Sequence, residues 1–398
     1  MCLACPFFEH RRAPSRAGRV DSSEGRAVAP PRRVGGAGHD GAMDVVELRS
    51  ARLRAHRLTA PAADVGAAAA HLLAVQAQEF WGGRWALGVR TTGDPGLSDV
   101  DAAFDAGRIV RTWTQRGTIH ILPAADLAWV LSITGERQQR AVPGRLRELG
   151  IDDDALTRAE RVARAALTGG GRLTRPELFA VWEAAGIDPS GQRGVHLLRM
   201  LSLRGVLVHG PVVARVDGAP TRQQYLVLSD EWIAHSAAPA DPLADFFVRY
   251  IDGHGPATAD DFAWWSGLPV RTARHAAEAS AGLLVDLGDG LFRARRLPRA
   301  APSVPRVLAL PSFEESYLSY RDRAATLAPH VARAVGPGVN GMVRPILVAD
   351  GEIVGVWTHS LAIGRHDEHP APDLLVPGTA TDAEVTAALD RYRRFITG

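Results

Sequence analysis

Apolar residues recur at helical spacing in three parts of the chain, and each part continues into short β-type runs. The clearest part spans residues 240–297, where one helix face carries Leu243, Phe246, Phe247, Tyr250 and Ile251. Gly255-Pro256 ends this helix, Thr258 caps a second helix, and a turn at 267–269 leads into a third. Apolar runs on both sides of residues 288–290 predict a β-hairpin. Three helices followed by a hairpin predict a winged helix.

The same order of elements is expected twice more, nearer the N-terminus. In residues 150–236 an amphipathic helix precedes a helix that opens with a capping box, formed by Thr174 and Glu177. A third helix and three strands complete this segment. In residues 43–145 two helices, the first over residues 61–75, precede two β-type runs. Both segments therefore predict further winged helices.

Beyond residue 300 the pattern changes to short runs that are rich in β-branched residues and apolar on both faces. Asp350-Gly351 between two of these runs predicts a hairpin turn. We therefore predict an α+β fold, in which three tandem winged-helix modules precede a C-terminal β-rich barrel or half-barrel. The expected boundaries are 1–42 for a disordered tail, 43–145, 150–236 and 240–297 for the winged helices, and 300–398 for the barrel.

Composition sets the tail apart from the rest of the chain. Residues 1–42 are rich in Pro, Gly, Arg and Ser without a hydrophobic period, which predicts disorder and makes Met43 a candidate start codon. Cys2 and Cys5 both lie in this tail, so we expect no disulfide in the folded part, a reducing cytoplasm and no zinc site. No run of 18 apolar residues exists, so no membrane span is expected.

The basic residues exclude two classes of chemistry. The chain has no lysine, and all 46 of its basic residues are arginine. A Walker phosphate loop and a Schiff-base lysine are therefore excluded. The tail holds seven Arg against four acidic residues, a net +3, whereas the whole chain carries +2, so the rest nets about −1. DNA affinity would therefore need a locally basic face rather than bulk charge.

The main candidate site is Gln76-Ala77-Gln78, which aromatic residues follow. Side chains at i and i+2 point the same way on an extended segment, so both amides can face one point if the preceding helix ends near Gln76. Two neutral amides suit a site that holds water and a base, and they do not suit a metal or phosphate site. The alternative is that both glutamines are ordinary polar residues at an exposed helix end.

Neighbouring residues allow two interpretations each. Glu79 is the only carboxylate beside the pair, so it is either a general base or a surface residue. Arg116, Thr118 and His120 either contact phosphate and water near a lesion or join the first module to its neighbour by hydrogen bonds.

Aromatic and basic side chains elsewhere also have a second interpretation. Trp81 and Trp85 either stack on DNA or pack in a core. Arg271, Arg274 and His275, on the third helix of segment 240–297, are either part of a DNA recognition helix or solvated charges.

Taken together, several segments resemble the AlkZ family of bacterial DNA glycosylases over the chain from about Asp44 to near the C-terminus. They are Gln76-Ala77-Gln78, Arg111-Thr112-Trp113, Arg116 to His120, residues 310–323, and Asn340-Gly341 before Arg344 to Val348. The resemblance implies three tandem winged helices with a β-barrel, excision of bases from alkylated DNA, and a catalytic role for Gln76 and Gln78. In related branches of the family the second motif position is Asp. Gln78 at this position makes the chain resemble the branch that is linked to unhooking of DNA crosslinks. Ala77 stands where a larger apolar residue is usual, which leaves the substrate range open.

The resulting hypothesis is a monofunctional, metal-independent DNA glycosylase that needs no cofactor. It would hydrolyse the N-glycosidic bond of N7-alkylated purines in double-stranded DNA and extend to interstrand crosslinks, acting as a monomer without an obligate protein partner. An N7-alkylated purine already carries positive charge, so its bond breaks with little acid help. The first alternative is a non-catalytic winged-helix DNA-binding protein or regulator. The second is a protein that binds an alkylating toxin in a deep apolar pocket.

Overall fold

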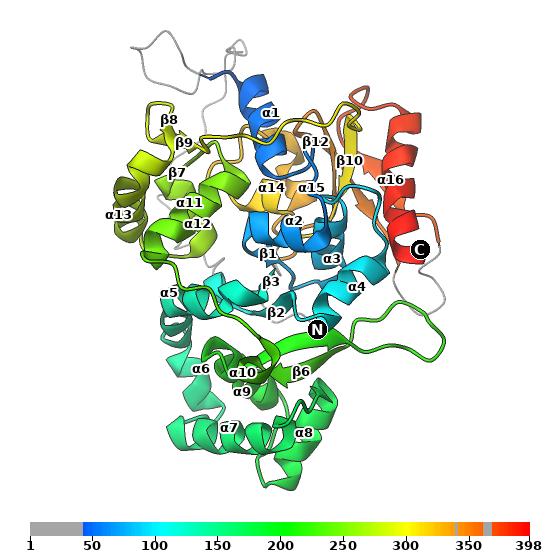
Figure 1. The fold of residues 1–398 in the computed structure, drawn as a ribbon. Coiled ribbons are helices and arrows are strands. Elements are labelled where there is room, and N and C mark those ends of the chain that lie inside the picture. The colour runs from blue at the N-terminus through cyan, green and yellow to red at the C-terminus, as the bar shows by residue number, and fades with distance from the viewer. Residues whose placement is uncertain (1–42, 339–340, 361–367) are drawn as a thin grey trace, which may run out of the picture.

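The computed structural model describes residues 43–338, 341–360 and 368–398 (Figure 1). The predicted tail, with Cys2 and Cys5, lies outside the described residues, and so does Asn340. The described part is a mixed α/β structure with three antiparallel sheets of six, four and three strands. Among the described helices, none has the length and apolar character needed to cross a membrane.

The six-stranded sheet combines strands from the first two predicted modules, in the order β1-β3-β2-β5-β6-β4. Its strands are β1 (Val75–Gln76), β2 (Ile109–Trp113), β3 (Ile119–Pro123), β4 (Leu173–Thr174), β5 (Leu207–Val212) and β6 (Gln224–Leu228). Arg111 on β2 pairs with His209 on β5, and this pairing joins the two halves. Segments 43–145 and 150–236 therefore share one continuous sheet.

The first segment, which the structure describes throughout, contains six α-helices. They are α1 (Val45–Ala55), α2 (Val65–Leu72), α3 (Phe80–Gly88), α4 (Leu97–Asp105), α5 (Leu127–Gln139) and α6 (Pro143–Glu148). The predicted helix at 61–75 is shorter at both ends. The Asp64 side chain accepts the Ala67 N–H at 2.9 Å and starts α2, while Leu73 has a positive φ of 63° and ends it.

The second segment contains the predicted helices and capping box. Its helices are α7 (Asp153–Leu167), α8 (Arg175–Ala184), α9 (Arg193–Leu203) and α10 (Ser229–Trp232). The Thr174 N–H donates to Glu177 at 2.7 Å, and the Thr174 hydroxyl accepts the Glu177 N–H in return. The fully buried Trp182 fixes α8 by donating its indole N–H to the Ala159 carbonyl on α7 at 3.0 Å.

The third segment also contains the expected elements. They are α11 (Pro242–His254), α12 (Ala259–Ser266), α13 (Val270–Ser280), β7 (Ala257–Thr258), β8 (Val285–Asp286) and β9 (Leu291–Arg293). The strands form a small sheet in the order β7-β9-β8. The predicted apolar face of α11 is buried at Phe246, Phe247, Tyr250 and Ile251. The classification of the three segments as winged helices stays a prediction.

The C-terminal segment forms an open sheet, so the closed form of the predicted barrel or half-barrel is wrong, and the half-barrel stays a prediction. Its strands are β10 (Val307–Leu310), β11 (Ile346–Ala349), β12 (Glu352–Thr358) and β13 (Ala371–Leu374), paired in that order. Three further helices are α14 (Glu315–Leu318), α15 (Ala332–Val335) and α16 (Asp382–Thr397), and short 3-10 turns are η2 (Gln115–Gly117), η3 (Ala124–Asp126), η4 (Ala281–Leu283) and η5 (Pro329–Val331).

Strands β10 to β12 are apolar on both faces because other parts of the chain cover the sheet, not because a barrel encloses them. One hydrophobic core includes β10 to β12, α16 and helices of the first segment. The Trp85 indole N–H on α3 donates to the Ala309 carbonyl on β10 at 2.8 Å, and its ring lies 5.3 Å from that of Tyr392 on α16. The first and last segments are therefore packed as one body, with α16 beside β10 in Figure 1.

Candidate active site

The two glutamines lie on an extended segment between α2 and α3. Gln76 ends the short strand β1 and pairs with His120 on β3, and the Ala77 N–H donates to the Ile119 carbonyl at 2.8 Å. The positive φ of Leu73 turns the chain out of the helix just before this strand. The extended geometry that the spacing requires is therefore present at the edge of the six-stranded sheet.

Hydrogen bonds fix both carboxamides. The Gln78 N–H donates to Gln76 Oε1 at 3.1 Å, and the Ile119 N–H donates to Gln78 Oε1 at 3.3 Å. Gln76 is only 5% exposed, whereas Gln78 is partly exposed. The alternative of two ordinary polar residues at an exposed helix end is therefore wrong for Gln76.

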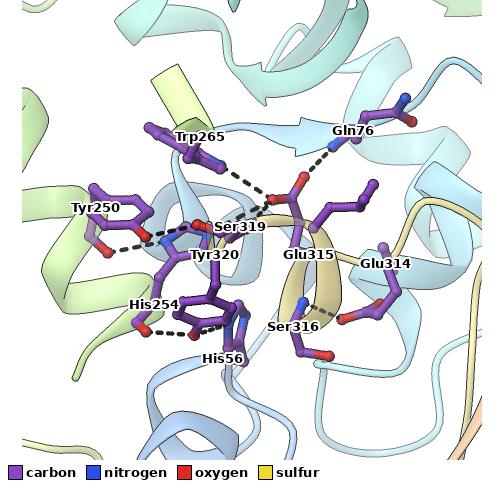
Figure 2. Close-up of polar contacts among 12 residues, drawn as sticks. His56, Gln76, Tyr250, His254, Trp265, Glu314, Glu315, Ser316, Ser319 and Tyr320 are labelled. Carbon is purple, nitrogen blue, oxygen red and sulfur yellow. Dashed lines mark hydrogen bonds and ion pairs between the residues drawn. The ribbon is translucent and has the colours of Figure 1, made fainter. Parts of the chain in front are cut away.

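A buried carboxylate lies directly behind Gln76. Glu315 Oε1 accepts the Gln76 N–H at 2.7 Å, and Oε2 accepts the Trp265 indole N–H at 3.1 Å and the Ser319 hydroxyl at 2.6 Å. His254 Nε2 lies 3.8 Å from the same Oε2. Figure 2 shows these contacts converging on Glu315, while the Gln76 carboxamide points away from it. Glu315 therefore contacts the backbone of Gln76, and the Gln76 side chain points away from Glu315.

The environment of Glu315 keeps its carboxylate charged. Burial alone raises its pKa, but nearby His254, the Arg116 charge and the Ser319 hydroxyl outweigh burial and hold the pKa at about 2. The charge is therefore a permanent feature of the site at neutral pH.

Glu314, the preceding residue, serves a different group of atoms. It forms a buried ion pair with Arg90, and its carboxylate accepts the Ser316 N–H at 2.9 Å. Arg90 also donates to the His56 carbonyl at 2.9 Å and to the Ala86 carbonyl at 3.0 Å. Glu314 thus stabilises the packing between α3 and the C-terminal segment rather than the glutamine pair.

The predicted residues after β2 are brought to the same sheet edge. His120 is fully buried, with Nδ1 2.9 Å from the Thr114 hydroxyl and Nε2 3.5 Å from an Arg116 guanidinium nitrogen. Burial, reinforced by the Arg116 charge, lowers the pKa of His120 to about 3, so the ring is neutral at pH 7. The Thr118 hydroxyl lies 3.5 Å from the Gln115 carbonyl and donates towards it. These contacts hold the turn around η2 against β1.

Arg271 and Arg274 lie on α13 and are exposed, and no contact joins them to the glutamines among the described residues. Arg274 forms an ion pair with Asp260 at 3.3 Å. The third segment reaches the site through Trp265 on α12 and His254 on α11. The third segment therefore contributes an indole donor rather than the arginines that the sequence singles out.

The structure decides between the alternatives for two tryptophans and shows what Glu79 contacts. Trp81 and Trp85 are 3% and 2% exposed, so the core-packing alternative is confirmed for both. The Glu79 carboxylate caps α3 by accepting the N–H groups of Trp81 at 3.2 Å and Gly82 at 2.6 Å. Glu79 is thus held as a helix cap next to Gln78.

Sequence reasoning gave no role to Glu315, Trp265 or Arg111. Arg111 Nε donates to the Ala77 carbonyl at 2.9 Å, and its guanidinium carbon lies 4.8 Å from the centre of the Phe80 ring. Burial lowers the pKa of Arg111 to about 9. One signal for Glu315 is present in the sequence, because Glu314 and Glu315 interrupt an otherwise mostly apolar and aromatic stretch.

Comparison with known proteins places this geometry in a family. The sequence profile described as DNA glycosylase AlkZ-like matches residues 69–395. The chain belongs to this AlkZ-like family. A relative from Streptomyces sahachiroi, described as an interstrand DNA cross-link repair glycosylase, is 27% identical over 273 residues, covering 63% of this chain and 70% of the relative. The solved structure of Streptomyces sahachiroi DNA glycosylase AlkZ matches with a TM-score of 0.67 at 22% identity, covering 87% of this chain and 96% of that one.

Within this AlkZ-like chain, the profile match includes both glutamines and Glu315. The TM-score shows a shared fold over most of the chain. In the part of the chain that the structure describes, no group of three or more His, Cys, Asp or Glu side chains could hold a metal ion. The side chains gathered at the site are carboxamides, a neutral imidazole, an arginine and a buried carboxylate.

Proposed function

We propose that this chain is a monofunctional DNA glycosylase that hydrolyses the N-glycosidic bond of N7-alkylated purines in duplex DNA. The observation that carries the proposal is the pair Gln76 and Gln78 on an extended segment. The Gln76 carboxamide oxygen accepts the Gln78 N–H, and the Gln78 carboxamide oxygen accepts the Ile119 N–H. Membership of the AlkZ-like family supports a glycosylase as the reaction class. In this proposal the three helical segments act as winged helices that bind the duplex.

Cleavage of this N-glycosidic bond needs little acid catalysis from the protein. An alkylated N7 makes the purine a cationic leaving group, and breaking the bond leaves an oxocarbenium-like sugar that water must attack. Neutral carboxamides cannot take a proton near pH 7, but each carbonyl oxygen has two lone pairs. The hydrogen bonds to Gln76 Oε1 and Gln78 Oε1 use one of these and orient the groups. The remaining acceptor capacity positions the water at the sugar carbon.

The low pKa of His120 agrees with this division of labour. An imidazole that stays neutral down to pH of about 3 cannot serve as the acid that protonates a leaving group near neutrality. His120 instead maintains the turn that carries Arg116, whose guanidinium faces DNA phosphate beside the lesion in this proposal. An N7-alkylated purine departs without such an acid, which fits the substrate class.

Crosslink unhooking is the second part of the proposal. The relative from Streptomyces sahachiroi is described as an interstrand DNA cross-link repair glycosylase, and its match covers 63% of this chain. An interstrand crosslink between two N7-alkylated purines presents the same cationic leaving group as a monoadduct. The same pair of carboxamides therefore suffices for both lesions.

The test is release of free 7-methylguanine from methylated duplex DNA. Wild-type protein should release it, and Gln76→Ala and Gln78→Ala should lose about 100-fold or more in rate, the range for removing one preorganised polar group from an active site. Activity should persist in EDTA, because the proposed mechanism contains no metal. Tight DNA binding without base release by the wild type would favour the non-catalytic DNA-binding alternative and refute the proposal.

A further inference from the structure

Glu315 connects the catalytic motif to two distant parts of the chain. Its Oε1 accepts the Gln76 N–H at 2.7 Å, and its Oε2 accepts donors from Trp265 on α12 and Ser319 after α14. The carboxylate is 1% exposed, so solvent does not compete for these bonds. The two oxygens therefore have separate roles, since one holds the motif and the other is itself held.

We propose that Glu315 is the positioning residue of the glutamine motif: its carboxylate fixes the Gln76 backbone and thereby sets where the carboxamides of Gln76 and Gln78 point. This inference rests on the proposed function, because it assigns the residue that orients the proposed catalytic pair. Glu315 contacts neither substrate nor water in this role.

The short strand that carries Gln76 is weakly fixed by its own pairing. β1 contains two residues, so its pairing with β3 supplies few hydrogen bonds to fix the backbone. The bond to Glu315 adds a charge-assisted one, which is about twice as strong as a bond between neutral groups. Without it, the buried Gln76 N–H would lack this acceptor, and the backbone at the first motif position would be free to shift.

The Glu315 carboxylate itself cannot turn. The Trp265 indole that donates to Oε2 is fully buried, and its ring lies 5.0 Å from that of Tyr250 and 5.3 Å from that of Phe246. A packed indole presents its N–H in one fixed direction. Glu315 is therefore clamped between a rigid donor and the motif, as Figure 2 shows.

A hydrogen bond within the motif transmits this restraint from the first glutamine to the second. Gln76 Oε1 accepts the Gln78 N–H at 3.1 Å, so a displaced Gln76 also loses its hold on Gln78. Ala77 between them is held from the other side, where Arg111 Nε donates to its carbonyl at 2.9 Å. Glu315 and Arg111 thus restrain adjacent residues of the motif with opposite charges.

The experiment compares Glu315→Ala and Glu315→Gln with the wild type in single-turnover release of 7-methylguanine. A displacement of about 1 Å at an active site costs about 100-fold in rate, so Glu315→Ala should lose about that factor. Glu315→Gln retains an acceptor for the Gln76 N–H and should recover to within about tenfold of the wild type. Affinity for a duplex containing 2′-fluoro 7-methylguanosine, which resists cleavage, should stay unchanged in both variants.

Glu314→Gln provides the matched control. Glu314 is the adjacent glutamate, is equally buried at 1% exposed, and interacts with Arg90 and Ser316 instead of the motif. This variant should unfold at a lower temperature yet keep the wild-type rate per folded molecule. If Glu314→Gln slows base release as much as Glu315→Ala does, the role of Glu315 is general stability and the inference is overturned.

The outcomes separate this inference from the proposed function. Absence of base release from wild-type protein refutes the proposed function itself. Release by wild type, loss in Gln76→Ala and a wild-type rate in folded Glu315→Ala would refute only the positioning role. If Glu315→Ala does not fold, Trp265→Phe decides, because it removes the donor to Oε2 and should slow release with unchanged DNA affinity.

Discussion

Three histidines, two buried and one largely buried, should make this protein lose stability as soon as the pH falls below the ordinary histidine range. Burial first, and nearby arginine charges second, lower the pKa of His120 and His209 to about 3 and that of His71 to about 4. In the unfolded chain the same rings titrate near 6.5. Protons therefore bind the unfolded chain first, and the folded state loses stability as the pH falls from 6.5 towards 3 to 4.

The magnitude follows from the size of these shifts. At pH 5 an unfolded histidine has gained about 2 kcal/mol from protonation, whereas a folded one with a pKa of about 3 to 4 has gained almost nothing. Three such residues together remove about 6 kcal/mol between pH 7.5 and pH 5. Folded proteins of ordinary stability have about 5 to 15 kcal/mol in total. A large part of the stability should therefore disappear while the Glu315 carboxylate, with its pKa of about 2, is still charged.

The assay is urea denaturation at half-unit steps from pH 7.5 to pH 5. Near pH 5 the unfolding free energy should fall by at least about 4 kcal/mol for each pH unit, which corresponds to these three protons, and the fully buried His56, whose pKa burial also holds well below its ordinary value, adds to the slope. His209→Asn should remove one proton from this slope, since the amide of Asn can still donate to the Arg111 carbonyl that His209 Nδ1 contacts at 3.0 Å. His275→Asn, at an exposed position on α13, should leave the slope unchanged.

A flat free energy of unfolding between pH 7 and pH 5 would refute this reasoning. It would mean that the buried rings are protonated in the folded state or retain their burial in the unfolded chain. A slope that falls equally in His209→Asn and His275→Asn would show that burial does not decide which histidine contributes.

Three further predictions concern packing and chemistry. Gly83→Ala should destabilise the protein by about 1 to 3 kcal/mol and slow base release, because its Cβ would lie 2.5 Å from that of Ala77 in the motif; thermal melting and base release measure it. Arg90→Ala should cost about 3 to 5 kcal/mol in urea denaturation, since it leaves the buried Glu314 without its partner. Sodium borohydride should trap no covalent enzyme on abasic DNA, because the chain has no lysine to form a Schiff base; a trapped covalent complex would contradict this.

The sequence predicts local structure well where one helix face is strongly apolar. Segment 240–297 shows this, because Phe246, Phe247 and Tyr250 bury the face that their spacing marks. The extended conformation at Gln76 was also accessible, since glutamines two residues apart can share a direction only outside a helix. Residue spacing and capping residues are short-range signals, because the residues involved are close together in the sequence.

The sequence contains no comparable signal for the pairing of strands that are far apart along the chain. Nothing near Arg111 indicates that β2 pairs with β5, which merges two predicted modules into one sheet. The apolar runs after residue 300 suggested a barrel because a strand covered on both faces looks the same whether a barrel or flanking helices cover it. Trp265 and Glu315 each read as ordinary residues of their own segments. Their role depends on the hydrogen bond between them, which forms only when the chain is folded.

The bond between Gln76 and Glu315 spans 239 positions of the chain. During synthesis the ribosome releases the glutamine motif long before it releases the acceptor for its backbone, and the strand β10 that Trp85 contacts also arrives late. A nascent or truncated polypeptide that ends before α14 therefore holds both glutamines without the carboxylate that orients them. If the positioning role is correct, incomplete copies of the chain cannot remove bases from DNA. Activity appears only when synthesis of the chain is nearly complete.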